Sequence, residues 1–191
     1  MMEKNARNEI VYLVGLPCSG KSTYIREHYT NHAVISNDAI VEEYASARGI
    51  DYGTAWSALD YKAVAAECRR RFNKAVREGR PVVIDNTNMT VSSRRLYEAA
   101  GSPSILFLRR KRNDKKAVIF EIDEAERLRR TEKRAAETGK RVPEDAIRRM
   151  KSLYVAPAAA EGFVSIVSAN KEKSDRNLRT NLLAQRLRKG R

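Results

Sequence analysis

The chain has 191 residues, enough for one domain with a short tail. Apolar residues make up 42% of it, no apolar run approaches the ~20 residues of a membrane span, and there are only two cysteines, Cys18 and Cys68. These features exclude a disordered chain, a membrane protein and a secreted disulfide scaffold, and the cytoplasm is the expected location.

The positive charge, +14 in total, is unevenly distributed. Residues 1–100 carry 14 basic and 12 acidic side chains, whereas residues 101–191 carry 24 basic and 12 acidic ones, a net charge of +12. This asymmetry indicates a polyanionic partner, either nucleic acid or acidic membrane lipid, unless the charges only solvate the surface.

An apolar, β-branched run over residues 9–14 predicts a strand that ends at Gly15, and a helix is expected from Lys21. The residues between match the pattern G-x-x-x-x-G-K-[ST], in which backbone N–H groups surround phosphate oxygens and the hydroxyl of Ser22 holds Mg²⁺. The sequence therefore predicts a nucleoside triphosphate site. Its predicted residues are Gly15, Pro17, Cys18, Ser19, Gly20, Lys21, Ser22 and Thr23.

A second short strand, over residues 33–35, leads into Asp38 and a helix over residues 39–48. Ligands bind beyond the carboxyl ends of parallel strands, where an aspartate can accept a proton from an attacking hydroxyl. Aspartate is also a favoured N-cap residue, so Asp38 is either a general base or the cap of this helix.

A long helix is predicted over residues 54–79, because apolar residues recur along it at four-residue steps and Gly79 and Pro81 follow. A third strand, over residues 82–84, ends in a polar row that either contacts a substrate or forms a turn. The row consists of Asp85, which resembles a Walker B carboxylate weakly, and of Asn86, Thr87 and Asn88.

A short helix over residues 92–100 precedes two apolar runs, 105–108 and 118–120, which flank the basic stretch 109–116. We interpret residues 104–122 as a hairpin with a basic tip, with one sheet strand plus a loop as the alternative.

A helix over residues 123–137 begins with a sequence typical of a capping box. Three arginines line one face of it: Arg127, Arg130 and Arg134. Like charges in this register destabilise an isolated helix, whereas they would stabilise a lid that closes over phosphates. We therefore predict a lid over about 123–142; the alternative is a solvated face, partly neutralised by Glu126 and Glu137.

Pro143 opens another helix, residues 163–167 form a last strand, and residues 174–191 form a basic amphipathic helix. Strands and helices thus alternate, which predicts an α/β fold with a central parallel sheet flanked by helices. We expect one phosphate-loop domain over residues 1–170, with the basic segment 171–191 attached to it.

Three segments in this order, 15–22, 35–38 and 83–88, resemble the polynucleotide 5′-hydroxyl kinase family, and the lid and residues 156–163 fit it too. The resemblance covers most of residues 9–168. It implies an adenylate-kinase-like P-loop fold that transfers the γ-phosphate of ATP, with Mg²⁺, to a hydroxyl of DNA or RNA.

The resemblance also implies roles for individual residues. Lys21 and Ser22 match the lysine and the metal-binding hydroxyl of the loop, and Asp38 matches the general base. Arg134, together with Arg130, matches the lid arginines that engage phosphates. Thr87 matches a segment near the acceptor, so Asp85, Asn86, Thr87 and Asn88 are the expected acceptor-binding residues.

Two departures concern the acceptor. Val41 stands where the phage-type kinase has an arginine that contacts the acceptor phosphate, and Asn37 stands where arginine commonly precedes the base. The acceptor is therefore the 5′-hydroxyl end or, as the alternative, a hydroxymethyl group on a modified pyrimidine in phage DNA.

Residues 116–123 are similar to the strand that opens the phosphatase domain of the bifunctional relatives. Glu121 stands in the place of the aspartate nucleophile, and Glu124 and Ala125 follow Asp123 where that chemistry needs Gly-Thr. We therefore expect no phosphatase activity.

The sequence favours a kinase that acts on a polynucleotide. A small-molecule kinase and a nucleic-acid-binding ATPase without transfer activity are the other candidates. Binding to nucleic acid should weaken as salt rises, because phosphate contacts release counterions. The expected partners are ATP and nucleic acid, not a membrane, and phage-type relatives can form homo-oligomers.

Overall fold

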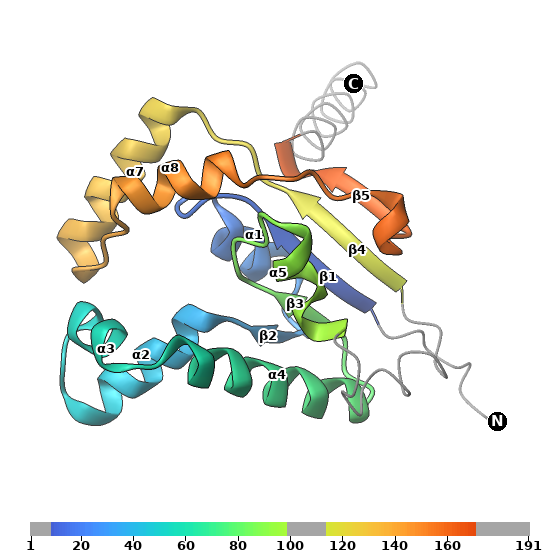
Figure 1. The fold of residues 1–191 in the computed structure, drawn as a ribbon, viewed down its shortest axis with the longest axis horizontal. Coiled ribbons are helices and arrows are strands. Elements are labelled where there is room, and N and C mark those ends of the chain that lie inside the picture. The colour runs from blue at the N-terminus through green and yellow to red at the C-terminus, as the bar shows by residue number, and fades with distance from the viewer. Residues whose placement is uncertain (1–8, 99–113, 171–191) are drawn as a thin grey trace, which may run out of the picture.

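The computed structural model describes residues 9–98 and 114–170. Five parallel strands form a single sheet in the order β2-β3-β1-β4-β5 (Figure 1). The strands are β1 Glu9–Val14, β2 Ala33–Ile35, β3 Val82–Ile84, β4 Asp114–Ile119 and β5 Ser165–Ser168.

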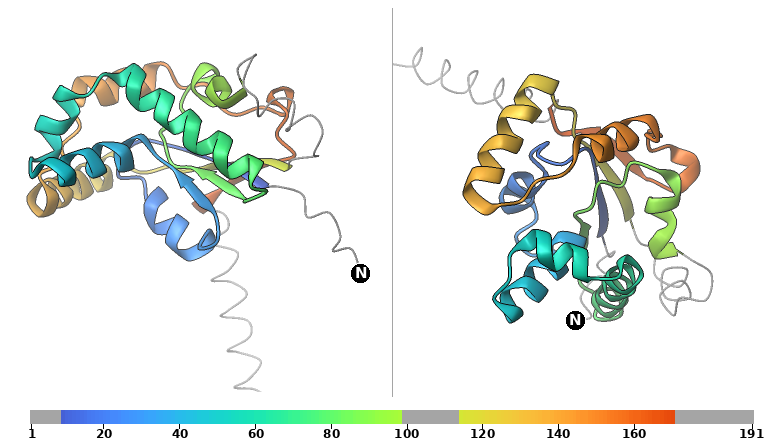
Figure 2. Two further views of the ribbon diagram at one scale, coloured as in Figure 1. Left: turned by 90° about the horizontal axis from the view of Figure 1, so that it is seen from below. Right: turned by 60° about the vertical axis from the view of Figure 1, so that its left-hand side comes forward.

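Helices connect the strands and cover the sheet (Figures 1 and 2). They are α1 Lys21–His28, α2 Asn37–Arg48, α3 Tyr52–Ala58, α4 Tyr61–Arg77, α5 Val91–Arg95, α7 Glu124–Thr138 and α8 Glu144–Ser152, with short 3₁₀ turns η1 Leu96–Glu98 and η2 Ala159–Glu161. The order of strands and helices confirms the predicted α/β fold with a parallel sheet.

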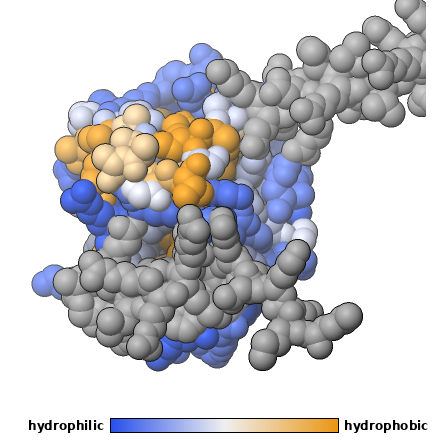
Figure 3. Space-filling model, turned by 90° about the vertical axis from the view of Figure 1, so that its right-hand side faces the viewer, coloured by the Kyte–Doolittle hydropathy of each residue, from blue (hydrophilic) through white to orange (hydrophobic). Residues whose placement is uncertain are grey.

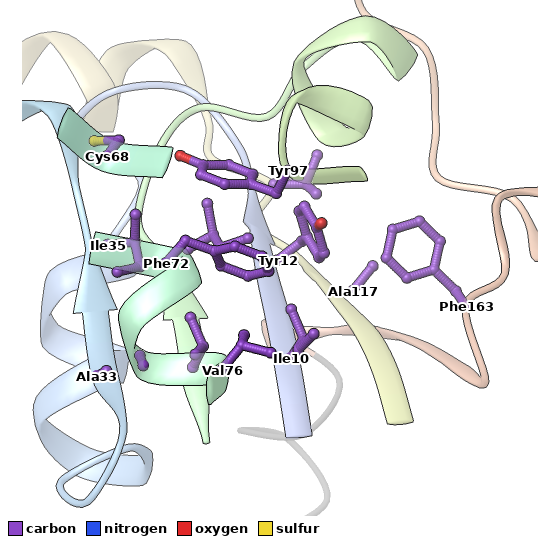
Figure 4. Packing of buried hydrophobic residues seen from close by; sticks show 14 residues of the cluster. Ile10, Tyr12, Ala33, Ile35, Cys68, Phe72, Val76, Tyr97, Ala117 and Phe163 are labelled. Carbon is purple, nitrogen blue, oxygen red and sulfur yellow. The ribbon is translucent and has the colours of Figure 1, made fainter. Parts of the chain in front are cut away.

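Both faces of the sheet are buried, because successive side chains of β1 enter two different cores. Ile10 and Tyr12 pack with Phe72 of α4 on one face (Figure 4). Val11 and Leu13 pack on the other face, against α1 and the end of β4. This double burial explains why β1 is continuously apolar rather than alternating in character.

The helix predicted over residues 54–79 is two helices, α3 and α4, separated at Leu59 and Asp60. The backbone of Leu59 is extended, and the carboxylate of Asp60 accepts a hydrogen bond from the N–H of Lys62. A side chain that caps a new helix competes with helix continuation, and periodicity alone does not reveal this. The predicted apolar face of the second half is buried as expected: Val64, Cys68, Phe72 and Val76.

Residues 114–119 form a sheet strand and not the second arm of a hairpin. β4 pairs in parallel with β1 along its whole length, and its residues Lys116–Ile119 also pair with β5. Both edges of these residues are thereby occupied. For residues 114–119 the structure therefore agrees with the alternative prediction, a sheet strand plus a loop. The predicted first arm of the hairpin, 105–108, lies outside the described residues.

Several predicted boundaries shift. The helix expected to begin at residue 39 begins at Asn37, and β5 begins at Ser165 rather than at residue 163. The helix predicted over 92–100 is α5 followed by η1 within the described part. The predicted basic helix 174–191 lies outside that part. Among the described helices, none combines the length and the apolar character needed to cross a membrane.

At the β5 edge of the sheet, apolar residues gather on the surface of the molecule (Figure 3). The large exposed apolar side chains of this stretch are Val164 and Ile166, which are 62% and 37% exposed. The opposite edge strand, β2, leads directly into the cleft described below.

A buried arginine ties α5 to the segment before β5. Arg94 is fully buried, and its guanidinium holds both carboxylate oxygens of Glu161 at 2.8 Å. It also donates to the carbonyls of Asn88 and Val155, at 2.9 and 3.0 Å.

We expect Arg94→Met to lower the free energy of unfolding by about 3–5 kcal/mol, because it leaves the carboxylate of Glu161 buried without its partner. Urea denaturation measures the change. The double variant Arg94→Met with Glu161→Leu should recover part of the loss. A loss below about 1 kcal/mol in the single variant is the size expected for an exposed ion pair. It would contradict the stabilising role given to the buried pair of Arg94 and Glu161.

Candidate active site

A cleft of about 1620 Å³ lies beyond the carboxyl ends of the strands. Its walls are residues 17–23 of the loop and α1, the start of α2, the polar row after β3, α3, and the lid formed by α7 and the residues after it. Gly15, also predicted at this site, lies behind the wall. Sites for a single small ligand have volumes of roughly 300–1,000 Å³. The cleft therefore has room for a nucleotide and for a second substrate.

The loop after β1 has the close packing that its glycines predict. A side chain at Gly15 would meet the carbonyl oxygen of Phe120 at 2.8 Å, and the N–H of Gly15 donates to the carbonyl of Thr87 at 3.0 Å. Gly20 has a φ of +100°, and it caps α1, whose first N–H groups border the cleft. Backbone N–H groups at the start of a helix form an anion site, so this arrangement fits a phosphate chain.

Lys21 is buried at the start of α1, and its ammonium group donates to the carbonyls of Gly15 and Leu16 at 3.0 and 2.8 Å. Burial lowers the pKa of Lys21 to about 8, although the carboxylates of Asp85 and Asp38 partly oppose this. Lys21 is thus mostly protonated at neutral pH, and bound phosphates would raise its pKa.

This pKa predicts that nucleotide binding takes up a proton. Above pH 8 the free protein has lost the Lys21 proton, and bound phosphates would restore it by raising the pKa. The affinity for ATP should therefore fall with rising pH, by up to about tenfold per pH unit. Calorimetric titrations in buffers of different ionisation enthalpy measure the uptake. Lys21→Met should bind more weakly and take up no proton at this site; an equal uptake by the variant would contradict the assignment.

The hydroxyl of Ser22 and the carboxylate of Asp85 face each other across the loop. The hydroxyl donates to Oδ2 of Asp85 at 3.5 Å, and burial raises the pKa of this carboxyl, while Lys21 opposes the shift. Oxygen donors of this kind are the ligands that Mg²⁺ prefers, and Mg²⁺ usually takes few of them from the protein. The two residues fit a magnesium ion that is otherwise held by phosphates.

Asp38 lies half-buried in the first turn of α2 and is not the N-cap. The cap is Ser36, whose hydroxyl accepts the N–H of Ala39. This removes the capping role for Asp38. Its carboxylate instead points into the cleft, accepting a hydrogen bond from the hydroxyl of Tyr52 at 2.9 Å and lying 3.4 Å from a guanidinium nitrogen of Arg134.

Tyr52 is a residue of the site that belongs to none of the motifs in the sequence. The pattern Asp51-x-x-Thr54, in which the carboxylate of Asp51 accepts the N–H of Thr54, marks the start of a helix and would have placed Tyr52 in its first turn. Burial and the neighbouring carboxylate of Asp38 raise the pKa of Tyr52, so its hydroxyl remains a hydrogen-bond donor.

The polar row after β3 divides into two kinds of residue. The amide of Asn86 accepts from the N–H of Asn37 at 3.0 Å and donates to the hydroxyl of Tyr97 at 3.2 Å. Asn88 is buried, and its amide donates to carbonyls, including that of Leu13 at 2.8 Å. Both asparagine side chains therefore hold the strand ends together, which favours the turn reading for them. All four residues of the row line the cleft, including the two asparagines.

The three lid arginines have different surroundings. Arg127 is buried, pairing with Glu124 at 2.7 Å and with Glu144 at 2.8 Å, so it joins α7 to α8. Arg130 pairs with Glu126 and lies 3.4 Å from the carbonyl of Cys18 in the loop. With Arg134 at Asp38, two of the three face the cleft, while Glu126 neutralises part of the row.

A second contact joins the lid to α2. Lys140, which follows α7, forms an ion pair with Glu42, and its ammonium group lies 4.9 Å from the centre of the Tyr52 ring. Neither Lys140 nor Glu42 belongs to a motif, so this contact could not be predicted from the sequence. The lid thus meets α2 at two places, Asp38 and Glu42, and α3 at Tyr52.

The family model described as an AAA domain matches residues 10–157 of the chain. Among solved structures, a provisionally assigned kinase from Chloroflexus aurantiacus is similar with a TM-score of 0.60 and 13% identity, over 96% of this chain and 98% of that one. A chain of the Pnkp1/Rnl/Hen1 RNA repair complex is similar with a TM-score of 0.56 and 21% identity, over 80% of this chain and 45% of that one.

A sugar kinase from a Janibacter species is similar with a TM-score of 0.51 and 15% identity, over 84% of each chain. At these identities the likeness shows the fold, which is that of P-loop kinases. One of these structures is a sugar kinase and another belongs to an RNA repair complex, so the fold leaves the acceptor open.

Proposed function

This chain belongs to the AAA domain family, and from that premise we propose that it is an ATP-dependent kinase whose acceptor is a hydroxyl of a polynucleotide. The 5′-hydroxyl end of DNA or RNA is the acceptor that we propose first. The observation that carries the proposal is the position of Asp38, a carboxylate that faces the cleft opposite the phosphate loop.

The residues of the cleft divide the reaction between them. The loop and Lys21 would hold the donor phosphates, and Ser22 with Asp85 would hold Mg²⁺, which neutralises phosphate charge when bound. Asp38 would accept the proton of the attacking hydroxyl. A bond forms from that oxygen to the γ-phosphorus as the bond to the β-phosphate oxygen breaks, leaving ADP. Arg134 would stabilise the transferring charge.

A base at this place could activate water as well as an organic hydroxyl, so the room beside Asp38 for a second substrate is what separates transfer from hydrolysis. Asp38 lies at the end of the cleft where α3 and the lid leave room for an organic acceptor. Tyr52 and Arg134 fix the orientation of its carboxylate. The size of the cleft, which has room for a second substrate, supports phosphate transfer over hydrolysis.

The charge distribution supports nucleic acid over a metabolite. Residues 101–191 carry a net charge of +12, and much of it is not needed to bind one triphosphate. A relative with this fold is part of an RNA repair complex, which is consistent with the proposal.

The surroundings of Val41 support a second candidate acceptor. Val41 is fully buried against Ala45 and Ala55, so the position three residues after the base cannot contact an acceptor phosphate. A terminal phosphate contact of the phage type is therefore lacking at this position. A hydroxymethyl group on a modified pyrimidine within phage DNA is the second acceptor that we propose.

Phosphate transfer from γ-labelled ATP tests the proposal. One acceptor is an oligonucleotide with a 5′-hydroxyl; the other has a 5′-phosphate and contains 5-hydroxymethyluracil. Label on the first supports end phosphorylation, and label on the second supports the modified base. Activity on either should fall as salt rises. ATP hydrolysis without transfer to either oligonucleotide, or transfer to a free sugar alone, would overturn the polynucleotide assignment.

A further inference from the structure

An aromatic pair lines the acceptor end of the cleft. Tyr52 and Trp56 lie one turn apart on α3, with ring centres 6.1 Å apart and planes inclined by 23°. Both contribute to the wall of the cleft, as does Tyr61 at the start of α4. We call Tyr52 and Trp56 the aromatic pair.

The packing of α3 does not require Trp56. The helix attaches to α2 through Ala55, which is fully buried with Val41 and Ala45. Trp56 is 45% exposed and borders the cleft. A large aromatic side chain left half-exposed in a cleft adds little to the core, whereas it offers a flat apolar face to a ligand.

The aromatic pair is fixed relative to the proposed base. The hydroxyl of Tyr52 donates to Oδ1 of Asp38 at 2.9 Å, so a nucleotide whose hydroxyl reaches Asp38 has the pair within reach of its base. Lys140 lies 4.9 Å from the centre of the Tyr52 ring, and Arg141 also lines the cleft. Aromatic faces beside cations are the combination with which proteins hold single-stranded nucleic acid.

We propose that the aromatic pair, through the exposed face of Trp56, stacks on the nucleobase of the nucleotide that carries the accepting hydroxyl. This inference rests on the proposed function, since a metabolite without a base would not use such a stack. The base would be recognised by its flat face, so the acceptor would be bound without regard to its nucleotide sequence.

Trp56 is the single tryptophan of the chain, so the tryptophan fluorescence of the protein reports on this position alone. Titration with the oligonucleotide that accepts phosphate should quench it. For the 5′-hydroxyl acceptor, the comparison is the same oligonucleotide with an abasic terminal nucleotide, whose binding is followed by anisotropy of a label at its 3′ end. We expect binding without comparable quenching. Equal quenching by the two would overturn the stack.

Steady-state kinetics supply the second test. For 5′-end phosphorylation, Trp56→Ala should lower kcat/KM for the base-bearing oligonucleotide by about tenfold to a hundredfold, the effect of losing one base–aromatic stack. It should have little effect on the abasic oligonucleotide, and Trp56→Phe should restore much of the loss. The matched control is Tyr154→Ala, which removes a 40% exposed aromatic side chain outside the cleft wall and should change neither value.

The outcomes separate the two proposals. If the wild-type protein transfers no phosphate to any oligonucleotide, the proposed function is wrong. If transfer occurs but Trp56→Ala lowers kcat/KM equally for base-bearing and abasic acceptors, the function stands and the stack is overturned. An unchanged KM for ATP in Trp56→Ala shows that the variant is folded and that its loss concerns the acceptor.

Discussion

Asp38→Asn is expected to lower kcat about 10²- to 10⁴-fold, the range for loss of a positioned general base. The substitution preserves the shape of the side chain and can still accept the hydrogen bond from Tyr52, but its amide cannot take the proton of the attacking hydroxyl. Because Asp38 lies outside the phosphate loop, the KM for ATP should change little. Single-turnover transfer of label from ATP to the oligonucleotide measures the chemical step.

Glu43→Gln provides the matched control for this prediction. Glu43 lies on the same helix, α2, but it is exposed and pairs with Arg71, outside the wall of the cleft. This variant should transfer phosphate at the wild-type rate. If Asp38→Asn transfers phosphate at the wild-type rate, Asp38 is not the general base. If that variant instead loses ATP binding, the carboxylate belongs to the donor site.

Arg134→Ala is expected to lower kcat about 10³-fold or more, in the range for an arginine that stabilises a transferring phosphoryl group. Its partly buried guanidinium extends from α7 to the carboxylate of Asp38, at 3.4 Å, and lines the cleft. Arg134→Lys keeps the charge but loses the planar fork that holds two phosphate oxygens, so it should recover only part of the rate.

The control lies on the same helix. Arg129 is exposed on the outer side of α7 and pairs with Glu126, so Arg129→Ala removes the same charge and the same kind of side chain away from the cleft. Its kcat should equal that of the wild type. If both variants lose the same modest factor, the effect of Arg134 is one of net charge on the lid, and the assigned role at the phosphates is wrong.

The fold and the phosphate loop could be predicted because their signals are local. The strand at 9–14, the glycine spacing and the lysine lie within fourteen consecutive residues, and sterics dictate what those residues do together. The parallel direction of the strands and the double burial of β1 follow from the alternation of strands and helices, whereas the order of the strands does not.

The missed features depend on contacts between distant segments. Asn86 and Asn88 are used within the fold because the carbonyls and N–H groups that they satisfy come from β1 and α2, far away in sequence. Tyr52 becomes a site residue only because α3 folds back beside Asp38. Arg127 has the helical spacing of the other lid arginines, and the approach of α8 alone makes it an internal residue.

The buried position of Arg127 determines how the lid can move. The guanidinium bonds Glu124 of α7 and Glu144 of α8 together, and separating the two helices would leave this charge without one of its partners. We therefore expect the two helices to move together, because a hinge between them, near Gly139, would break this contact. In the proposed kinase, opening of the cleft would then carry α8 along with Arg130 and Arg134.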